Sequence, residues 1–317
     1  MIPFSPPRID QKVIDEVVDT LKSGWITTGP KTKEFERRLT AYCGNKATLA
    51  VNSNTVGLEV VLRWFGVQEG DEVIVPAYTY CATANVIVHC GAKPVMVDVN
   101  ADDFDVCLER VREAITDKTK VIMPVDLGGM PCAYDELFEL VEAEDVKTLF
   151  QAKTEEQGKL GRILILSDSA HSIGAEYKGR KAGCLADVSV FSFHAVKNLT
   201  TAEGGAIMLN LPEPFDNEEV YRYLCTYTLH GQNKDALAKT KKGAWRYDVL
   251  VSGFKGNMTD IMASIGLVEL SRYEDDTLHY RKCIYDQYTD AFARYGWAEL
   301  PIYETEDRKS SYHVYCL

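Results

Sequence analysis

Apolar residues recur along this chain at two alternating spacings. From Ile9 to Leu21 they follow the spacing of an amphipathic helix, and Gly24 stands where such a helix typically ends. Short apolar runs then alternate with further amphipathic segments as far as residue 209. Because strands separated by helices form crossovers onto a parallel sheet, this order predicts an α/β fold with a mostly parallel sheet. The expected strands are 47–51, 72–76, 94–98, 120–125, 163–166, 188–193 and 206–209, with helices ending at 42 and spanning 55–65, 82–89, 108–115 and 134–143.

Two features of the pattern indicate how the chain is divided. Residues 1–245 are expected to form a large domain that includes the N-terminal segment, and residues 246–317 a smaller carboxy-terminal α+β domain. In the small domain the spacing predicts helices near 260–273 and 276–294 and a strand at 312–317. We expect this domain to be incomplete, because the chain stops inside that strand. The polar, weakly periodic segment 147–162 is expected to be an exposed insertion without a catalytic role.

Composition narrows the class of protein. The 317 residues are 46% hydrophobic, which is enough to bury a large core, and the formal net charge of −12 argues against nucleic acid as the main partner. Nine cysteines without a CxxC pair or a metal-ligand spacing favour reduced thiols over a disulfide framework, and predict no metal site. No export signal and no run of eighteen apolar residues is found, so we expect a cytoplasmic protein that does not contact membranes.

A lysine and an aspartate follow two of the expected strands. Lys197 comes shortly after the strand 188–193 and precedes the pair Gly204 and Gly205, and Asp168 ends the strand that begins at 163. Taken alone, the lysine is more often a surface charge and the aspartate a helix cap. Together they supply what pyridoxal phosphate requires, namely an amine for its aldehyde and a carboxylate for its pyridinium nitrogen. The pair therefore predicts a pyridoxal-phosphate enzyme.

Other polar and aromatic residues lie at neighbouring strand ends. The run Asn52 to Thr55 joins a strand to a helix, and its N–H groups and hydroxyls suit either a phosphate or simple helix capping. Tyr80 could stack on a planar ring or belong to the core, and Ser192 offers a hydroxyl before Lys197. His171, three residues after Asp168, either faces the same ligand or is structural.

These segments resemble a known family. In chain order, NSNT at Asn52, GDEVIVPAYTYCATAN at Gly70, SDSAHSIGAEYKGRKAG at Ser167, SFHAVKNLTTAEGG at Ser192, LHGQ at Leu229 and GNMTD at Gly256 resemble the motifs of the DegT/DnrJ/EryC1/StrS sugar aminotransferases. The resemblance covers nearly the whole chain. It implies the type I fold of pyridoxal-phosphate-dependent transferases, with a mixed, mostly parallel sheet between helices.

The resemblance also implies roles for individual residues. Lys197 would form the Schiff base with the cofactor, Asp168 would bind the pyridinium nitrogen, His171 would bond the phenolic oxygen and Tyr80 would stack on the ring. Thr55, the backbone of Val56 and Ser192 would hold the phosphate, with Asn257 reaching in from the other subunit of a homodimer. Trp25, Thr27 and His313 would lie near the substrate, although a connecting loop and a strand are ordinary places for such residues. Asn54 stands where the family often has glycine, and we expect it to tolerate a left-handed backbone.

The implied reaction moves an amino group from an amino acid, glutamate in most of the family, to a nucleotide-diphosphate keto sugar for polysaccharide biosynthesis, with Lys197 as the proton carrier. Three alternatives stay open. A sugar 3-dehydratase uses the same fold and cofactor but replaces the lysine by histidine, which Lys197 speaks against. A cyclitol aminotransferase shares these motifs, and a non-catalytic regulatory or sensor protein could retain the cofactor pocket.

Overall fold

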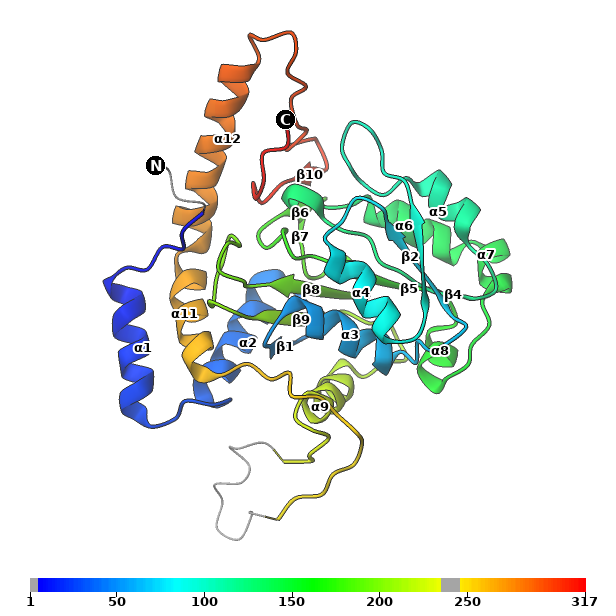
Figure 1. The fold of residues 1–317 in the computed structure, drawn as a ribbon, viewed down its shortest axis with the longest axis horizontal. Helices are drawn as coiled ribbons and strands as arrows, with labels where there is room; N and C mark the ends of the chain where they lie inside the picture. The colour runs from blue at the N-terminus through cyan, green and yellow to red at the C-terminus, as the bar shows by residue number, and fades with distance from the viewer. Residues whose placement is uncertain (1–4, 235–245) are drawn as a thin grey trace.

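The computed structural model describes residues 5–234 and 246–317. A seven-stranded sheet runs through its centre, with helices on both faces (Figure 1). The strands are β1 (Ala47–Val51), β2 (Glu72–Pro76), β3 (Lys93–Val97), β4 (Thr119–Ile122), β5 (Leu164–Asp168), β8 (Val188–Ser192) and β9 (Gly205–Leu209). Their order across the sheet is β1-β9-β8-β5-β4-β2-β3, and β9 runs antiparallel to both of its neighbours while the other pairs are parallel. The predicted α/β class and mostly parallel mixed sheet are confirmed.

Alternate residues of each central strand enter two separate apolar clusters. In β5, Ile165 belongs to one cluster, and Leu164 and Leu166 belong to the other. A strand buried on both faces needs apolar residues throughout, which is why these strands are visible in the sequence as continuous apolar runs. The first cluster is covered by α2 (Pro30–Cys43), α5 (Leu108–Ala114), α6 (Tyr134–Glu142) and α11 (Asp260–Ser271), the second by α3 (Asn54–Trp64), α4 (Cys81–His89) and α9 (Asn217–Tyr227).

The segment 147–162 is largely exposed, as its polarity suggested, but it is folded and anchored to the core. It carries two short helices, α7 (Glu144–Leu149) and α8 (Glu155–Leu160). Gln157 is fully buried and donates from Nε2 to the carbonyl of Phe65 over 3.0 Å. Arg162 is also buried and forms a bidentate pair with Asp187, with both N–O distances at 2.8 Å. Gln157 and Arg162 are therefore internal partners of the fold, while the other residues of the segment are exposed or half-buried as predicted.

The carboxy-terminal part leads away from the sheet. From α11 the chain passes through the π-helical turn η2 (Tyr273–Leu278) into α12 (His279–Phe292), which rises away from the sheet edge (Figure 1). It returns as β10 (Arg308–Lys309), which joins β6 (Glu176–Tyr177) and β7 (Arg180–Lys181) in a small sheet. None of the described helices combines the length and the apolar composition that a bilayer crossing requires. The predicted boundary after residue 245 lies at the edge of the undescribed segment 235–245, so the division into two domains stays a prediction.

The strand expected at 312–317 is not formed. Instead the N–H groups of Ser311 and His313 donate to the carbonyls of Gly129 and Gly128, over 2.9 and 3.0 Å. Tyr312 between them has a φ of +56°, which interrupts an extended strand. The segment is thus tied to a turn after β4 rather than to a neighbouring strand, and the prediction was wrong.

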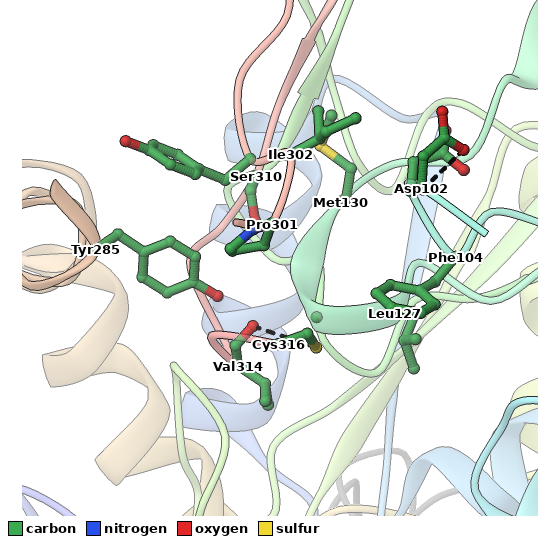
Figure 2. A pocket seen from close by; sticks show the side chains of 13 residues that line it. Asp102, Phe104, Leu127, Met130, Tyr285, Pro301, Ile302, Ser310, Val314 and Cys316 are labelled. Carbon is green, nitrogen blue, oxygen red and sulfur yellow. Dashed lines mark hydrogen bonds between the residues drawn. The ribbon is translucent and has the colours of Figure 1, made fainter. Parts of the chain in front are cut away.

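Figure 2 shows how this segment meets the turn. Side chains of the carboxy-terminal segment and Tyr285 of α12 face the loops 102–104 and 127–130 across a cavity of about 30 Å³. This volume holds about one water molecule, so the contact is a packed one and not a substrate site. Leu127 lies on this contact and also lines the larger cavity described below.

A buried aspartate fixes the loop between α1 (Gln11–Ser23) and α2. The side chain of Asp260, at the start of α11, accepts hydrogen bonds from the N–H groups of Gly29, Lys31 and Thr32 over 2.7, 3.0 and 2.9 Å. These are donors of the first turn of α2, which have no partner inside their own helix. One carboxylate therefore joins the loop before α2 to the first turn of α11.

Replacing this carboxylate should destabilise the fold strongly. We expect Asp260→Ala to lower the free energy of unfolding by about 3 kcal/mol, because several buried N–H groups lose their acceptor at once. Urea unfolding followed by circular dichroism measures this. The control is Asp216→Ala, which removes the exposed cap of α9 and should cost about 1 kcal/mol. Equal losses in the two variants would contradict the role given to Asp260.

Candidate active site

The carboxyl ends of β1, β5 and β8 meet at one edge of the sheet. β5 and β8 are parallel neighbours, with Asp168 in register with Val190, so the chain segments that follow them emerge side by side. A cavity of about 580 Å³ lies at this edge. Six of the predicted site residues line it: Thr55, Tyr80, Asp168, His171, Ser192 and Lys197.

Asp168 is a buried carboxylate held by neutral donors. Its Oδ2 accepts from Thr83 Oγ1 over 2.8 Å, and its Oδ1 accepts from Asn54 Nδ2 over 3.1 Å and from the N–H of Ala170 over 3.3 Å. Burial raises the pKa of the carboxyl above its ordinary value, while these hydrogen bonds and, less strongly, the charge of Lys197 oppose the rise. Within the described residues Asp168 forms no ion pair, so its charge has no direct counterion.

Asn54 and Thr83 were not predicted as partners of Asp168. Asn54 was expected to adopt a left-handed backbone in place of glycine, but it is the first residue of α3 and its amide also donates to the carbonyl of Val190 over 2.8 Å. Thr83 lies in the first turn of α4 and is fully buried. The sequence signal for both was their position at strand-to-helix junctions of the same sheet edge.

The second glycine of the pair permits α3 to approach the sheet. A Cβ atom on Gly205, at the start of β9, would lie 2.6 Å from the backbone nitrogen of Asn54 and 2.7 Å from the carbonyl oxygen of Phe191. Any side chain at this position would push α3 away from β8 and β9. The close contact brings the Asn54 amide within reach of Asp168.

Lys197 lies in a turn five residues beyond the end of β8. The N–H of Lys197 donates to the carbonyl of His194 over 2.9 Å, which closes the turn and directs the side chain into the cavity wall. Burial lowers the pKa of the Lys197 amine below its ordinary value, and the charge of Asp168 opposes this. No carboxylate of the described residues forms an ion pair with Lys197. The amine can therefore lose its proton more easily than a surface lysine can.

His171 and His313 form a pair behind the cavity. Their ring centroids are 4.3 Å apart with an interplanar angle of 34°. Burial lowers the pKa of His171 to about 3 and that of His313 to about 2, so both rings are neutral near pH 7. His313 Nδ1 is 2.8 Å from Asn198 Oδ1. His313 was predicted to lie near the substrate, but it does not line the cavity and instead packs against the ring of His171. The Nδ1 atom of His171 is buried without a partner in the described part of the chain.

The predicted phosphate residues lie at the first turn of α3 and the end of β8. Thr55 and Ser192 line the cavity, and helix first turns leave N–H groups free for an anion. Ser53 is the N-cap, and its Oγ accepts from the N–H of Val56 over 3.2 Å. The backbone of Val56, which was expected to bind the phosphate, is therefore already engaged, and Val56 does not line the cavity.

The mouth of the cavity is aromatic and charged. Tyr80 and Tyr78 line the cavity and are 76% and 51% exposed, so both rings are accessible to a ligand. His194 and Glu203 also line the cavity, with Nε2 and Oε1 3.7 Å apart. Neither had been identified from the sequence, although both belong to the lysine motif. The entrance thus offers groups for stacking and for hydrogen bonding.

Three predicted residues lie outside the cavity of their own chain and close to one another. Trp25 Nε1 donates to the carbonyl of Thr28 over 3.1 Å, and Asn257 Nδ2 donates to Thr28 Oγ1 over 2.6 Å. The exposed Thr27 accepts from the N–H of Asp260 over 3.0 Å. The Oδ1 atom of Asn257 is buried without a partner among the described residues. These residues form one group, centred on the loop before α2.

The residues of the cavity fit pyridoxal phosphate. A buried carboxylate without a counterion suits a pyridinium nitrogen, because pairing with a cation offsets the cost of its burial. The unpartnered Nδ1 of His171 suits a polar ring substituent, and the first turn of α3 suits the phosphate. Lys197 and Asp168 line the same cavity, as an amine and an acid for one ring must.

Comparison with known proteins gives the same result. The uncharacterized protein MJ1066 of Methanocaldococcus jannaschii is 40% identical over 274 residues, which are 86% of this chain and 65% of MJ1066. The spore coat polysaccharide biosynthesis protein SpsC of Bacillus subtilis is 35% identical over 317 residues, which are 100% of this chain and 75% of SpsC. The proposed sugar aminotransferase Spr1654 of Streptococcus pneumoniae, in its PMP form, matches with a TM-score of 0.94 at 51% identity over 99% of this chain and 78% of Spr1654.

This chain therefore spans less than two thirds of MJ1066 and about three quarters of the other two proteins. Spr1654 is also solved in a PLP form, which matches with a TM-score of 0.92. The predicted cofactor, pyridoxal phosphate, and the type I transferase fold are thus confirmed at the level of the family. The family profile matches residues 7–317, and the chain belongs to the DegT/DnrJ/EryC1/StrS aminotransferase family.

Proposed function

We propose that this chain is a pyridoxal-phosphate-dependent aminotransferase that moves an amino group from glutamate to a keto group of a nucleotide-diphosphate sugar. One observation carries the proposal: Asp168, a buried carboxylate without a counterion, and Lys197, an amine of lowered pKa, line the same cavity. The pairing suits a ligand that has both a cationic ring and an electrophilic carbon. The bound cofactor supplies an electron sink for the carbon that carries the amino group.

Lys197 is the residue that moves protons. Its amine lines the cavity, where it could take a proton from a substrate carbon and return it at another position. A lowered pKa keeps part of the amine population neutral near pH 7, as a base requires. Asp168 holds the positive charge at the ring nitrogen throughout. Asn54 and Thr83 fix the positions of its two carboxylate oxygens.

His171 acts as a neutral hydrogen-bonding group rather than as an acid. Its ring is fixed by the contact with His313, and its Nδ1 is free to bond a polar substituent of the cofactor. Thr55, Ser192 and the first turn of α3 would hold the phosphate, and Tyr80, which lines the same cavity, would stack on the ring. The apolar residues Val125, Leu127, Ala170 and Val196 limit the access of water to the remaining wall.

The relatives support a sugar as the acceptor. SpsC carries the name of a polysaccharide biosynthesis protein, and Spr1654 that of a proposed sugar aminotransferase. Incubation of the protein with glutamate and a panel of nucleotide-linked keto sugars and keto-cyclitols, followed by mass spectrometry of the products, tests both donor and acceptor. Amination of a keto-cyclitol instead of a sugar would identify a cyclitol aminotransferase. Cofactor binding without turnover of any substrate would favour a non-catalytic sensor.

We also propose a homodimer with shared sites. Trp25, Thr27 and Asn257 lie together outside their own cavity, which supports a role at the site of a second subunit. None of the nine cysteines, all of which lie in the described part of the chain, forms a disulfide, which supports a reducing compartment such as the cytoplasm.

The covalent link to the cofactor should form at Lys197. Borohydride reduction of the protein with bound pyridoxal phosphate, followed by peptide mapping, is expected to place the pyridoxyl group on this residue. Lys197→Ala should lose turnover by about a thousandfold or more while still binding the cofactor through its phosphate. A label on another lysine, or full activity in the variant, would contradict the assignment.

The neutral state of His171 should make the cofactor-free protein less stable in acid. Because the pKa is about 6.5 in the unfolded chain and about 3 in the folded protein, the unfolded chain binds the proton first as the pH falls. The stabilisation of wild type relative to His171→Asn is therefore fully present above pH 6.5 and should shrink by about 2 kcal/mol between pH 7 and pH 4.5. Urea unfolding at several pH values measures it. His89→Asn, at an exposed histidine, is the control, and the same pH dependence in both variants would refute the prediction.

Shared sites can be tested with hybrid dimers. Asn257→Ala and Lys197→Ala proteins should each be inactive or strongly impaired. Mixing them should restore up to about a quarter of wild-type activity, because half of the dimers are hybrids with one intact site each. Subunit exchange is followed with differently tagged chains. Exchange without recovery, or a monomer by light scattering, would show that each site is built from one chain.

A further inference from the structure

A second buried carboxylate lies behind the turn that carries Asp168 and His171. Asp126 follows β4 and is 1% exposed. Its Oδ1 accepts from Tyr134 Oη over 2.8 Å and from the N–H of Cys132 over 3.1 Å. Its Oδ2 accepts from Ser172 Oγ over 2.6 Å and from Ser169 Oγ over 3.3 Å. The mechanism described above makes no use of this residue.

The hydroxyl groups around Asp126 have a defined direction. The Tyr134 hydroxyl has one proton, which an ionised carboxylate attracts more strongly than a serine does. Ser169 likewise gives its single proton to Asp126, so Ser167 Oγ, 2.6 Å from the Tyr134 oxygen and 2.7 Å from Ser169 Oγ, donates to one of these two hydroxyls. Each donor points toward Asp126, and hydrogen bonds aligned in this way strengthen one another.

This network holds the residues on both sides of Asp168. Ser167 precedes and Ser169 follows Asp168, and side chains in an extended segment point to alternating faces. Asn54 and Thr83 therefore hold the Asp168 side chain itself, while the Asp126 network holds its two neighbours, whose side chains point to the opposite face. The N–H of Asp126 also donates to the carbonyl of Asp168 over 3.3 Å.

The same carboxylate holds the residue after His171. Ser172 makes the shortest of the four bonds to Asp126, and its N–H donates to the carbonyl of Ser169 over 3.1 Å, which closes the turn between Asp168 and His171. The titratable groups next to Asp126 are Tyr134 and Cys132, both buried. Among the described residues Asp126 has no cationic partner, so its charge depends on the four donors.

We propose that Asp126 is a positioning residue, which sets the place and orientation of Asp168 and His171 against the cofactor through Ser167, Ser169 and Ser172. The inference rests on the proposed function, because it assigns Asp126 to the same site. A buried acid with a purely structural role would affect only stability when it is replaced. Replacement of Asp126 should in addition change the affinity for the cofactor and the protonation of its ring nitrogen.

The test compares Asp126→Ala with the conservative Asp126→Asn and with Tyr134→Phe. The affinity for pyridoxal phosphate is measured by titration of the cofactor-free proteins. The absorbance of the bound cofactor is then recorded against pH, which gives the midpoint of its change. For Asp126→Ala we expect about tenfold weaker binding. We also expect the pH midpoint to rise by about half a unit. If Asp168 is held less firmly, the ring nitrogen carries less positive charge, and the proton on the nitrogen of Lys197 is then repelled less and lost at a higher pH. Asp126→Asn should recover part of both changes, and Tyr134→Phe should show smaller ones.

The matched control is Asp187→Asn. Asp187 is also almost fully buried, and it pairs with Arg162 at the opposite edge of β5 and β8. This variant should lower the melting temperature at least as much as Asp126→Asn but leave the cofactor affinity and the pH midpoint unchanged. If Asp126→Ala does not fold, the other two variants carry the comparison.

Two outcomes separate this inference from the proposed function. A wild-type protein that binds cofactor at Lys197, with Asp126 variants equal to wild type in affinity and midpoint, overturns the positioning role alone. Midpoint shifts of the same size in Asp187→Asn also overturn it, since they would reflect general loosening. A wild-type protein that takes up no cofactor contradicts the proposed function and this inference together.

Discussion

Asp168 carries its charge at the buried end of β5, and the surrounding residues are arranged to make that charge tolerable. A buried carboxylate is costly unless it is paired or well supplied with hydrogen bonds. Here the bonds come from an asparagine, a threonine and a backbone N–H, none of which neutralises the charge. The fold therefore holds this carboxylate buried without a counterion among the described residues and leaves the compensation of its charge to a ligand.

The rest of the sheet edge follows from this requirement. Asn54 reaches Asp168 only because Gly205 lets the first turn of α3 lie against β8 and β9. The same helix end then faces the cavity, with the hydroxyl of Thr55 beside it. One close backbone contact thus serves two purposes, since it supplies a donor to the acid and brings a helix N-terminus to the place where an anion can bind.

The sequence allowed prediction of those site residues that follow a recognisable local pattern. Lys197 and Asp168 follow apolar strands, and a parallel sheet brings such positions together, so both the fold and the central pair could be predicted. The roles of Thr83 and Asp126 could not be predicted, because their partners Asp168 and Ser172 are distant in sequence. In addition, no local pattern distinguishes a threonine that bonds a distant carboxylate from one that caps a helix. The strand expected at 312–317 failed for a related reason. Its apolar and aromatic residues suit a strand, but the backbone partners are the glycines of a distant turn.

The carboxylate of Asp260 has a consequence for assembly. It joins the loop before α2 to the first turn of α11, and Asn257 is bonded to the same loop through Thr28. The loop, the asparagine and the helix are therefore joined into one hydrogen-bonded unit. In the proposed dimer, the surface that one subunit offers to its partner is already ordered in the separate chain. Such preorganisation reduces the conformational entropy lost on association, so the two subunits can form a precise joint site from a modest contact area.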